Sequence, residues 1–131
     1  MPVKKASNFR LANSTKAKLP SLAFAAMKEA VLGKEYDLTL QIVSLEEIHI
    51  LNWQYRKIDK PTDILSFPYS KTEGEMFINI EETKKEALKF GRTFPNFLAF
   101  LFIHGLVHLA GHDHSSTMER IEARFRKQFK V

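Results

Sequence analysis

The most informative part of the sequence is FIHGLVHLAGHDH, residues 102–114, which carries four of the five histidines of the chain. His104 and His108 stand four positions apart, so on a helix they lie about one turn apart on the same face. Gly111 predicts the end of that helix, because glycine adopts the left-handed conformation without a Cβ clash. The chain can then turn back and bring His114 to the first two histidines. Three imidazoles around one point, with a fourth position open, are the ligand set of a catalytic zinc site.

Two properties of this segment favour metal binding over an ordinary buried histidine. A lone histidine on an apolar helix is more often a hydrogen-bonded core residue, but two at this spacing with a third beyond a glycine rarely arise by chance. The run 97–103 is apolar throughout, so we expect a helix that is buried on all sides. Buried imidazoles need a polar partner, and a metal ion supplies one.

The spacing also matches an extended zinc-protease pattern, His-x-x-x-His-x-x-Gly-x-x-His, at His104, His108, Gly111 and His114. In proteases of that kind, the residue after the first histidine is a glutamate that acts as the general base. Gly105 occupies that position here. We therefore predict a hydrolytic site that lacks the protease base.

Length, composition and charge set limits on the kind of protein. With 131 residues, 44% of them hydrophobic, we expect one domain with one core over residues 1–131. There is no cysteine, so His, Asp and Glu must supply any metal ligands. The net charge of +5 mildly favours polyanionic partners. The N-terminal residues are polar and no apolar run approaches the roughly 20 residues of a membrane span, so we expect a cytoplasmic protein.

Helical periodicity appears in several parts of the chain. It covers residues 20–32, where Gly33 should end the helix, and a capping box of Ser44 and Glu47 opens a helix that should run to about Arg56. Further helices are expected over residues 81–90, from Pro95 through the histidines, and after a second capping box formed by Ser116 and Glu119.

Strand patterns lie between these helices. We expect strands over 38–43, 64–67 and 76–80, and at most a short one around 9–11. Pro68 should end the second of these strands, and Gly74 should lie in a polar loop. Helices and strands interleave without a regular βαβ rhythm. The sequence therefore predicts an α+β fold in which helices pack on a small mixed sheet.

Separated segments of the chain together resemble the YbeY family, bacterial metallo-endoribonucleases of rRNA maturation that are specific for single strands. The first is the histidine run, His104-Gly-Leu-Val-His-Leu-Ala-Gly-His-Asp-His114. The second comprises Leu51-Asn52, Tyr55-Arg56 and Asp59-Lys-Pro-Thr-Asp-Ile-Leu-Ser-Phe-Pro68, and Gly74-Glu75-Met76-Phe77-Ile78 is similar to a third, shorter one. The resemblance covers most of residues 45–115, and two long motifs in the same order are highly specific.

The resemblance implies a fold, a site and an activity. The fold would be zincin-like, with a four-stranded mixed sheet and a buried metal-bearing helix. His104, His108 and His114 would hold one Zn²⁺ per chain, and Arg56 would lie in the cleft that faces the metal. The activity would be zinc-dependent cleavage of single-stranded rRNA, notably in 16S 3′-end maturation, with a role in ribosome quality control. The expected partners are single-stranded RNA and the ribosome or one of its subunits; no membrane and no DNA are expected.

The corresponding mechanistic hypothesis is metal-assisted hydrolysis of a phosphodiester. Zinc would lower the pKa of a bound water to about 7, and Arg56 would bind the scissile phosphate. His112, which stands where the family often has tyrosine, would protonate the leaving oxygen; Glu75 replaces a common aspartate. From the residues alone, the simpler interpretations are an ion pair of Arg56 with Asp59 or Asp63, and an exposed turn position for His112.

Two other classes of protein remain open. A metallohydrolase or peptidase acting on another substrate would have the same cage, but Gly105 argues against it. A zinc-stabilised ribosome-binding factor would need a fourth protein ligand, which His112 or Asp113 would have to supply. Asp113 can instead orient a ligand imidazole or cap the turn.

Overall fold

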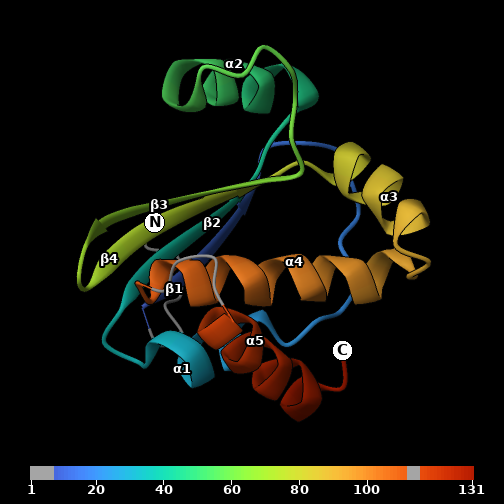
Figure 1. Ribbon diagram of the computed structural model, residues 1–131. Helices are drawn as coiled ribbons and strands as arrows, with labels where there is room; N and C mark the ends of the chain where they lie inside the picture. The colour runs from blue at the N-terminus through green and yellow to red at the C-terminus, as the bar shows by residue number, and fades with distance from the viewer. Residues whose placement is uncertain (1–7, 112–115) are drawn as a thin grey trace.

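The computed structural model describes residues 8–111 and 116–131 of the chain (Figure 1). In chain order, the elements are β1 (Phe9–Asn13), α1 (Phe24–Leu32), β2 (Asp37–Ile42), α2 (Leu45–Arg56), β3 (Ile64–Ser70), β4 (Glu73–Ile78), α3 (Ile80–Lys89), α4 (Phe94–Leu109) and α5 (Ser116–Phe129).

The strands of the described residues form one mixed sheet of four strands in the order β1-β2-β4-β3. β1, β2 and β4 run parallel to one another, whereas β3 runs antiparallel to β4 and forms an edge. The predicted α+β class and the small mixed sheet are therefore confirmed. The zincin-like character of the arrangement stays a prediction.

The main core lies between the sheet and α4. Burial alternates along β2, where Leu38, Leu40 and Ile42 are fully buried and the residues between them are partly exposed. α4 packs against this face of the sheet, and α1 and α5 pack on α4 from the other side (Figure 1). Ten of the sixteen residues of α4 are buried, as its apolar composition predicts.

The ends of α4 follow local capping rules. The side chain of Thr93 accepts a hydrogen bond from the backbone N–H of Asn96 at 3.3 Å, and Pro95 lies in the first turn. Ala110 is the C-cap, and Gly111 follows with a φ of 97°. The predicted start at Pro95 and stop at Gly111 are thus confirmed. Within the described ranges no single helix is long and apolar enough to cross a membrane; α3 and α4 would pass that test only as a pair bent by 104°.

α2 lies on the other side of the sheet from α4 (Figure 1). Its N-cap is Ser44, whose hydroxyl accepts from the N–H of Glu47 at 3.1 Å, as the capping box predicts. Ile48 is fully buried and packs in a small cluster with Leu65 of β3 and Phe77 of β4. These contacts hold the N-terminal half of α2 on the sheet, and the ring of Tyr55 near the other end packs against Phe67 of the edge strand.

Several boundaries in the sheet region differ from those predicted. β3 continues through Pro68 to Ser70, because it is an edge strand and its register shifts between these residues, which accommodates a residue without an N–H. Gly74, expected in a loop, lies inside β4. Ile80, expected in a strand, begins α3, because Asn79 caps that helix by accepting from the N–H of Glu82.

Two helices begin at residues other than those predicted, α1 later and α5 one residue earlier. The helix expected from Pro20 starts at Phe24, because the N–H of Phe24 donates to the carbonyl of Leu22 across Ala23, whose φ of −82° and ψ of 57° are those of an inverse γ-turn. Ser116, expected as an N-cap, is already helical in α5. A difference of one residue at a helix end is ordinary.

Gly105 lies where α4 closely approaches the sheet. A Cβ at this position would lie 2.7 Å from Met76 Cε, 3.0 Å from Ile64 Cδ1 and 3.0 Å from Ser66 Oγ. Only the hydrogen of glycine fits without movement of these neighbours. This is the position at which the zinc-protease pattern has its glutamate, so the structure gives a steric reason for the missing base.

We expect Gly105→Glu to destabilise the protein by more than about 3 kcal/mol, because it forces a charged side chain between α4 and the sheet. Leu88→Glu is the matched control, since Leu88 on α3 is 82% exposed; the change there should stay within about 0.5 kcal/mol. Urea unfolding followed by circular dichroism measures both. Equal stability of the two variants would mean that Gly105 does not set the distance between helix and sheet.

Candidate active site

A pocket of ≈ 560 Å³ follows the edge strand β3, between α4 and the end of α2. It brings together Arg56 from the last turn of α2 and two histidines of α4, His104 and His108. The rest of the lining comes from Tyr55, from β3 and from the loop that precedes it. Segments almost fifty residues apart in the sequence therefore share one pocket.

The two histidines lie one turn apart on α4 and are half-buried between buried neighbours. Both line the same pocket, in agreement with their spacing. The third predicted ligand, His114, lies outside the described residues, as do His112 and Asp113. Within the described residues, no three His, Asp or Glu side chains form a metal-binding group. The three-histidine cage therefore stays a prediction.

Arg56 is exposed at the end of α2 and lines the histidine pocket. The simplest alternative for this residue was an ion pair with Asp59 or Asp63. In the described part of the chain, Asp59 instead pairs with His49 at 2.8 Å, and Asp63 accepts from the hydroxyl of Thr62 at 3.4 Å. Neither aspartate neutralises Arg56, so its donors are available to a ligand in the pocket.

Asn52 fixes the segment that carries Arg56. The spacings of three and four residues place His49, Asn52 and Arg56 on one face of α2. Asn52 is only 1% exposed, and its Nδ2 donates to the carbonyl of Lys60 at 2.8 Å. This bond ties the last turns of α2 to the loop that leads into β3, so it holds Arg56 near the edge strand.

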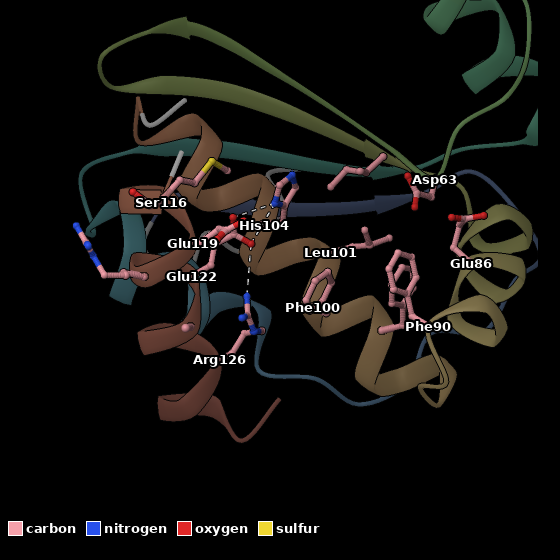
Figure 2. Close-up of a pocket in the computed structure, with 15 residues that line it drawn as sticks. Asp63, Glu86, Phe90, Phe100, Leu101, His104, Ser116, Glu119, Glu122 and Arg126 are labelled. Atoms are coloured by element: carbon pink, nitrogen blue, oxygen red, sulfur yellow. Dashed lines mark hydrogen bonds and ion pairs between the residues drawn. The ribbon is translucent and has the colours of Figure 1, made fainter. Parts of the chain in front are cut away.

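Glu122 is a residue at this site that sequence reasoning missed. Both of its carboxylate oxygens lie 3.0 Å from Nδ1 of His104, and Arg126 lies on its other side (Figure 2). The available signal was its spacing, since it lies four residues after Met118 and three before Phe125 and so shares the apolar face of the last helix. A carboxylate on the apolar face of an amphipathic helix requires a polar partner.

A second, larger pocket of ≈ 1060 Å³ continues from His104 between α4 and α5 toward α3 (Figure 2). It shares His104 and Asp63 with the first pocket. Its far end is aromatic, because Phe90 stacks on Phe97 at 5.3 Å and Phe97 on Phe100 at 5.7 Å between ring centroids. His104 therefore stands at the boundary between a polar pocket and a partly aromatic one.

Asp63 is the carboxylate that both pockets share. Burial raises the pKa of this carboxyl above its usual 3.8, and the negative charge of Glu86 raises it further. Figure 2 shows the two carboxylates at the same end of the larger pocket. Hydrogen bonds from Ile64 and Thr62 act in the opposite direction but are weaker.

The described donors fit a zinc ion. Neutral imidazole is a preferred zinc ligand, and the chain has no thiolate that would compete. His104 and His108 line one pocket, and His104 bonds through Nδ1 to a carboxylate, an arrangement common around catalytic zinc. The predicted third ligand, His114, lies outside the described ranges.

A mixed sheet and a cleft in which an arginine and two histidines meet are typical of a hydrolase that acts on a phosphate ester. Comparison with known proteins agrees with this class. The family described as Endoribonuclease YbeY matches residues 4–130 of the chain. The chain therefore belongs to the YbeY endoribonuclease family and is an enzyme of the hydrolase class that acts on RNA.

Individual relatives bear the same name. A protein named Endoribonuclease YbeY from Acholeplasma laidlawii is 38% identical over 95 residues, which cover 70% of this chain and 69% of the relative. One from Bacillus velezensis is 36% identical over 122 residues, covering 82% and 76%. The solution structure of TM1509 from Thermotoga maritima superposes with a TM-score of 0.66 at 28% identity, over 92% of this chain and 88% of that one.

Asp63→Asn should stabilise the protein at neutral pH. The pKa of Asp63 is raised in the folded state, so folding favours the protonated form and ionisation costs stability as pH rises. The stability gain of Asp63→Asn should therefore be largest at pH 7 and shrink toward the usual aspartate pKa of about 4. Urea unfolding between pH 4 and pH 7 measures this difference. Glu35→Gln, which removes an exposed carboxylate, is the control; a gain that does not change with pH would contradict the assignment.

Proposed function

We propose that the protein is a zinc-dependent endoribonuclease specific for single-stranded RNA. The observation that carries the proposal is the shared pocket, in which Arg56 meets His104 and His108. Membership of the YbeY family supplies the substrate class. The structure argues against a peptidase, because Gly105 leaves little room for a side chain at the position of the protease base.

His104, His108 and His114 would hold one zinc ion per chain. When bound there, zinc supplies Lewis acidity and lowers the pKa of a coordinated water to about 7. The side chains of the pocket must then bind and orient the RNA strand. His112, which lies outside the described residues, is proposed to protonate the leaving oxygen.

Arg56 would bind the scissile phosphate. A guanidinium presents parallel N–H donors that match two non-bridging oxygens, and its charge offsets the negative charge that develops during attack. Its exposed side chain and the absence of an ion pair with Asp59 or Asp63, both described residues, support this role. Because Asn52 holds the preceding turn, the backbone that carries Arg56 is kept beside the pocket.

Tyr55 would contact an unpaired base. Its side chain is 65% exposed although it lines the pocket, and its ring packs against Phe67 with centroids 5.0 Å apart. An exposed ring that packs on a second ring can stack with a nucleobase. The face of a base is accessible for such stacking in an unpaired nucleotide. This arrangement supports a preference for single strands over duplexes.

The proposed substrate is rRNA, with a role in 16S 3′-end maturation and ribosome quality control in the cytoplasm. The family to which the chain belongs and its net charge of +5 support a partner rich in phosphate. The ribosome or one of its subunits would present the single-stranded segment. Neither DNA nor a membrane is part of the proposal.

The first test compares the wild type with His108→Ala and Arg56→Ala. We expect stoichiometric zinc in the wild type and cleavage of single-stranded but not duplex RNA. His108→Ala should lose zinc and cleavage together, because two remaining ligands hold zinc weakly. Arg56→Ala should keep zinc but lose about 10²- to 10³-fold in kcat/KM. Metal analysis and a fluorescent oligonucleotide assay provide both measurements.

Arg124→Ala is the control for charge, because Arg124 is exposed on α5 and lies in neither pocket. It should retain zinc and activity. Full activity of Arg56→Ala would refute the role of that arginine. A zinc-loaded wild type that cleaves no RNA, even on ribosomal subunits, would favour a binding factor instead.

Tyr55→Ala tests the proposed stacking contact. We expect affinity for a single-stranded oligonucleotide to fall about 5- to 150-fold, since stacking on one aromatic ring is worth about 1–3 kcal/mol. Tyr69→Ala is the matched control, because Tyr69 is 58% exposed but lies outside both pockets. Fluorescence anisotropy in zinc-free buffer measures binding without cleavage. Equal losses in the two variants would remove Tyr55 from the proposed site.

A further inference from the structure

α5 buries a carboxylate beside the candidate metal site. Glu122 is 6% exposed and is the only acidic residue that counts as buried among the described residues. Burying a carboxylate costs several kcal/mol unless hydrogen bonds and opposite charge compensate for the loss of water. The partners of Glu122 therefore indicate why the residue occupies this position.

The shortest contacts of Glu122 go to an imidazole. Oε1 and Oε2 each lie 3.0 Å from Nδ1 of His104, whereas Nη1 of Arg126 is 3.6 Å from Oε1 (Figure 2). Arg126 is only 24% exposed in its side chain, and its guanidinium also lies over the ring of Phe100 at 5.1 Å. Arg126 thus balances the charge, while the closer contacts join Glu122 to His104.

This contact determines which nitrogen of His104 carries a proton. A carboxylate oxygen only accepts hydrogen bonds, so Nδ1 of His104 must be the donor. Nε2 is then the nitrogen that can bind a metal. The bond also restrains the orientation of a ring that lines both pockets.

We propose that Glu122 is the positioning residue of the metal site: it holds His104 as the Nδ1-protonated tautomer and directs Nε2 to the zinc ion. This inference rests on the proposed zinc site but not on RNA cleavage. Glu122 acts through His104 and contacts neither metal nor substrate. α5 packs on α4 through apolar residues such as Met118 and Phe125, and this packing brings Glu122 to His104.

The test uses three variants of the full chain. Glu122→Gln keeps an oxygen that accepts from Nδ1 but removes the charge, and Glu122→Leu removes both. Glu119→Gln is the matched control, since Glu119 lies almost one turn earlier on α5, lines the same larger pocket and is exposed. Zinc affinity is measured by competition with a chromogenic chelator at fixed pH. Long-range ¹H–¹⁵N spectra of the zinc-free proteins report the tautomer of His104.

We expect a graded loss of zinc affinity, about tenfold for Glu122→Gln and about 100-fold for Glu122→Leu, with no change for Glu119→Gln. The spectra should show Nδ1–H for His104 in the wild type and a shift toward the Nε2–H tautomer in Glu122→Leu. If Glu122→Leu fails to fold, the Gln variant still tests the loss of zinc affinity.

A purely structural role predicts a different result. The Glu122 variants would then lower the melting temperature of the zinc-free protein but bind zinc within about twofold of the wild type, with the His104 tautomer unchanged. That outcome would overturn the inference and leave the zinc site in place. A wild type that binds no zinc would instead overturn the proposed metal site, and the inference with it, in the first titration.

Discussion

The whole pocket depends on how closely α4 packs against the sheet. At Gly105 the backbone of the helix lies so near Met76, Ile64 and Ser66 that a Cβ would have to displace them. This approach puts the adjacent His104 and the next turn beside the edge strand β3. The missing side chain therefore has two effects, because it permits this close approach and leaves no carboxylate at the position of the protease base.

The wall of the pocket opposite α4 comes from the end of α2, which is held in place by interactions of a different kind. α2 rests on the sheet through a small apolar cluster. A buried amide, Asn52, joins it to the loop before β3 by a hydrogen bond to the carbonyl of Lys60, and His49 pairs with Asp59 of the same loop. Arg56 follows within one turn and is left exposed to the pocket. The site thus combines an apolar, tightly packed helix with a more loosely attached one. Such a division would suit the proposed mechanism, in which the histidines of α4 hold a metal ion while Arg56 binds the RNA.

Local rules predicted much of this arrangement. The spacing of His104 and His108, the capping of α2 by Ser44 and the stop at Gly111 were read correctly, because each depends on residues within one or two turns of the helix. The wrong boundaries in the sheet region arose where pairing with neighbouring strands determines how far a strand extends. Pro68 continues β3 because that strand lies at the edge of the sheet, and a strand's place in its sheet is not encoded next to the proline.

The sequence by itself determined the α+β class, the helical pairing of two histidines and membership of the YbeY family, since periodicity, caps and motifs are local properties of the chain. The family resemblance implied that Arg56 faces these histidines, and the tertiary structure brings all three to one pocket. Only the tertiary structure showed that Glu122 bonds to His104. Contacts of this kind join residues that lie far apart along the chain. They form only when helices pack on the sheet in one particular register, which no short stretch of sequence specifies.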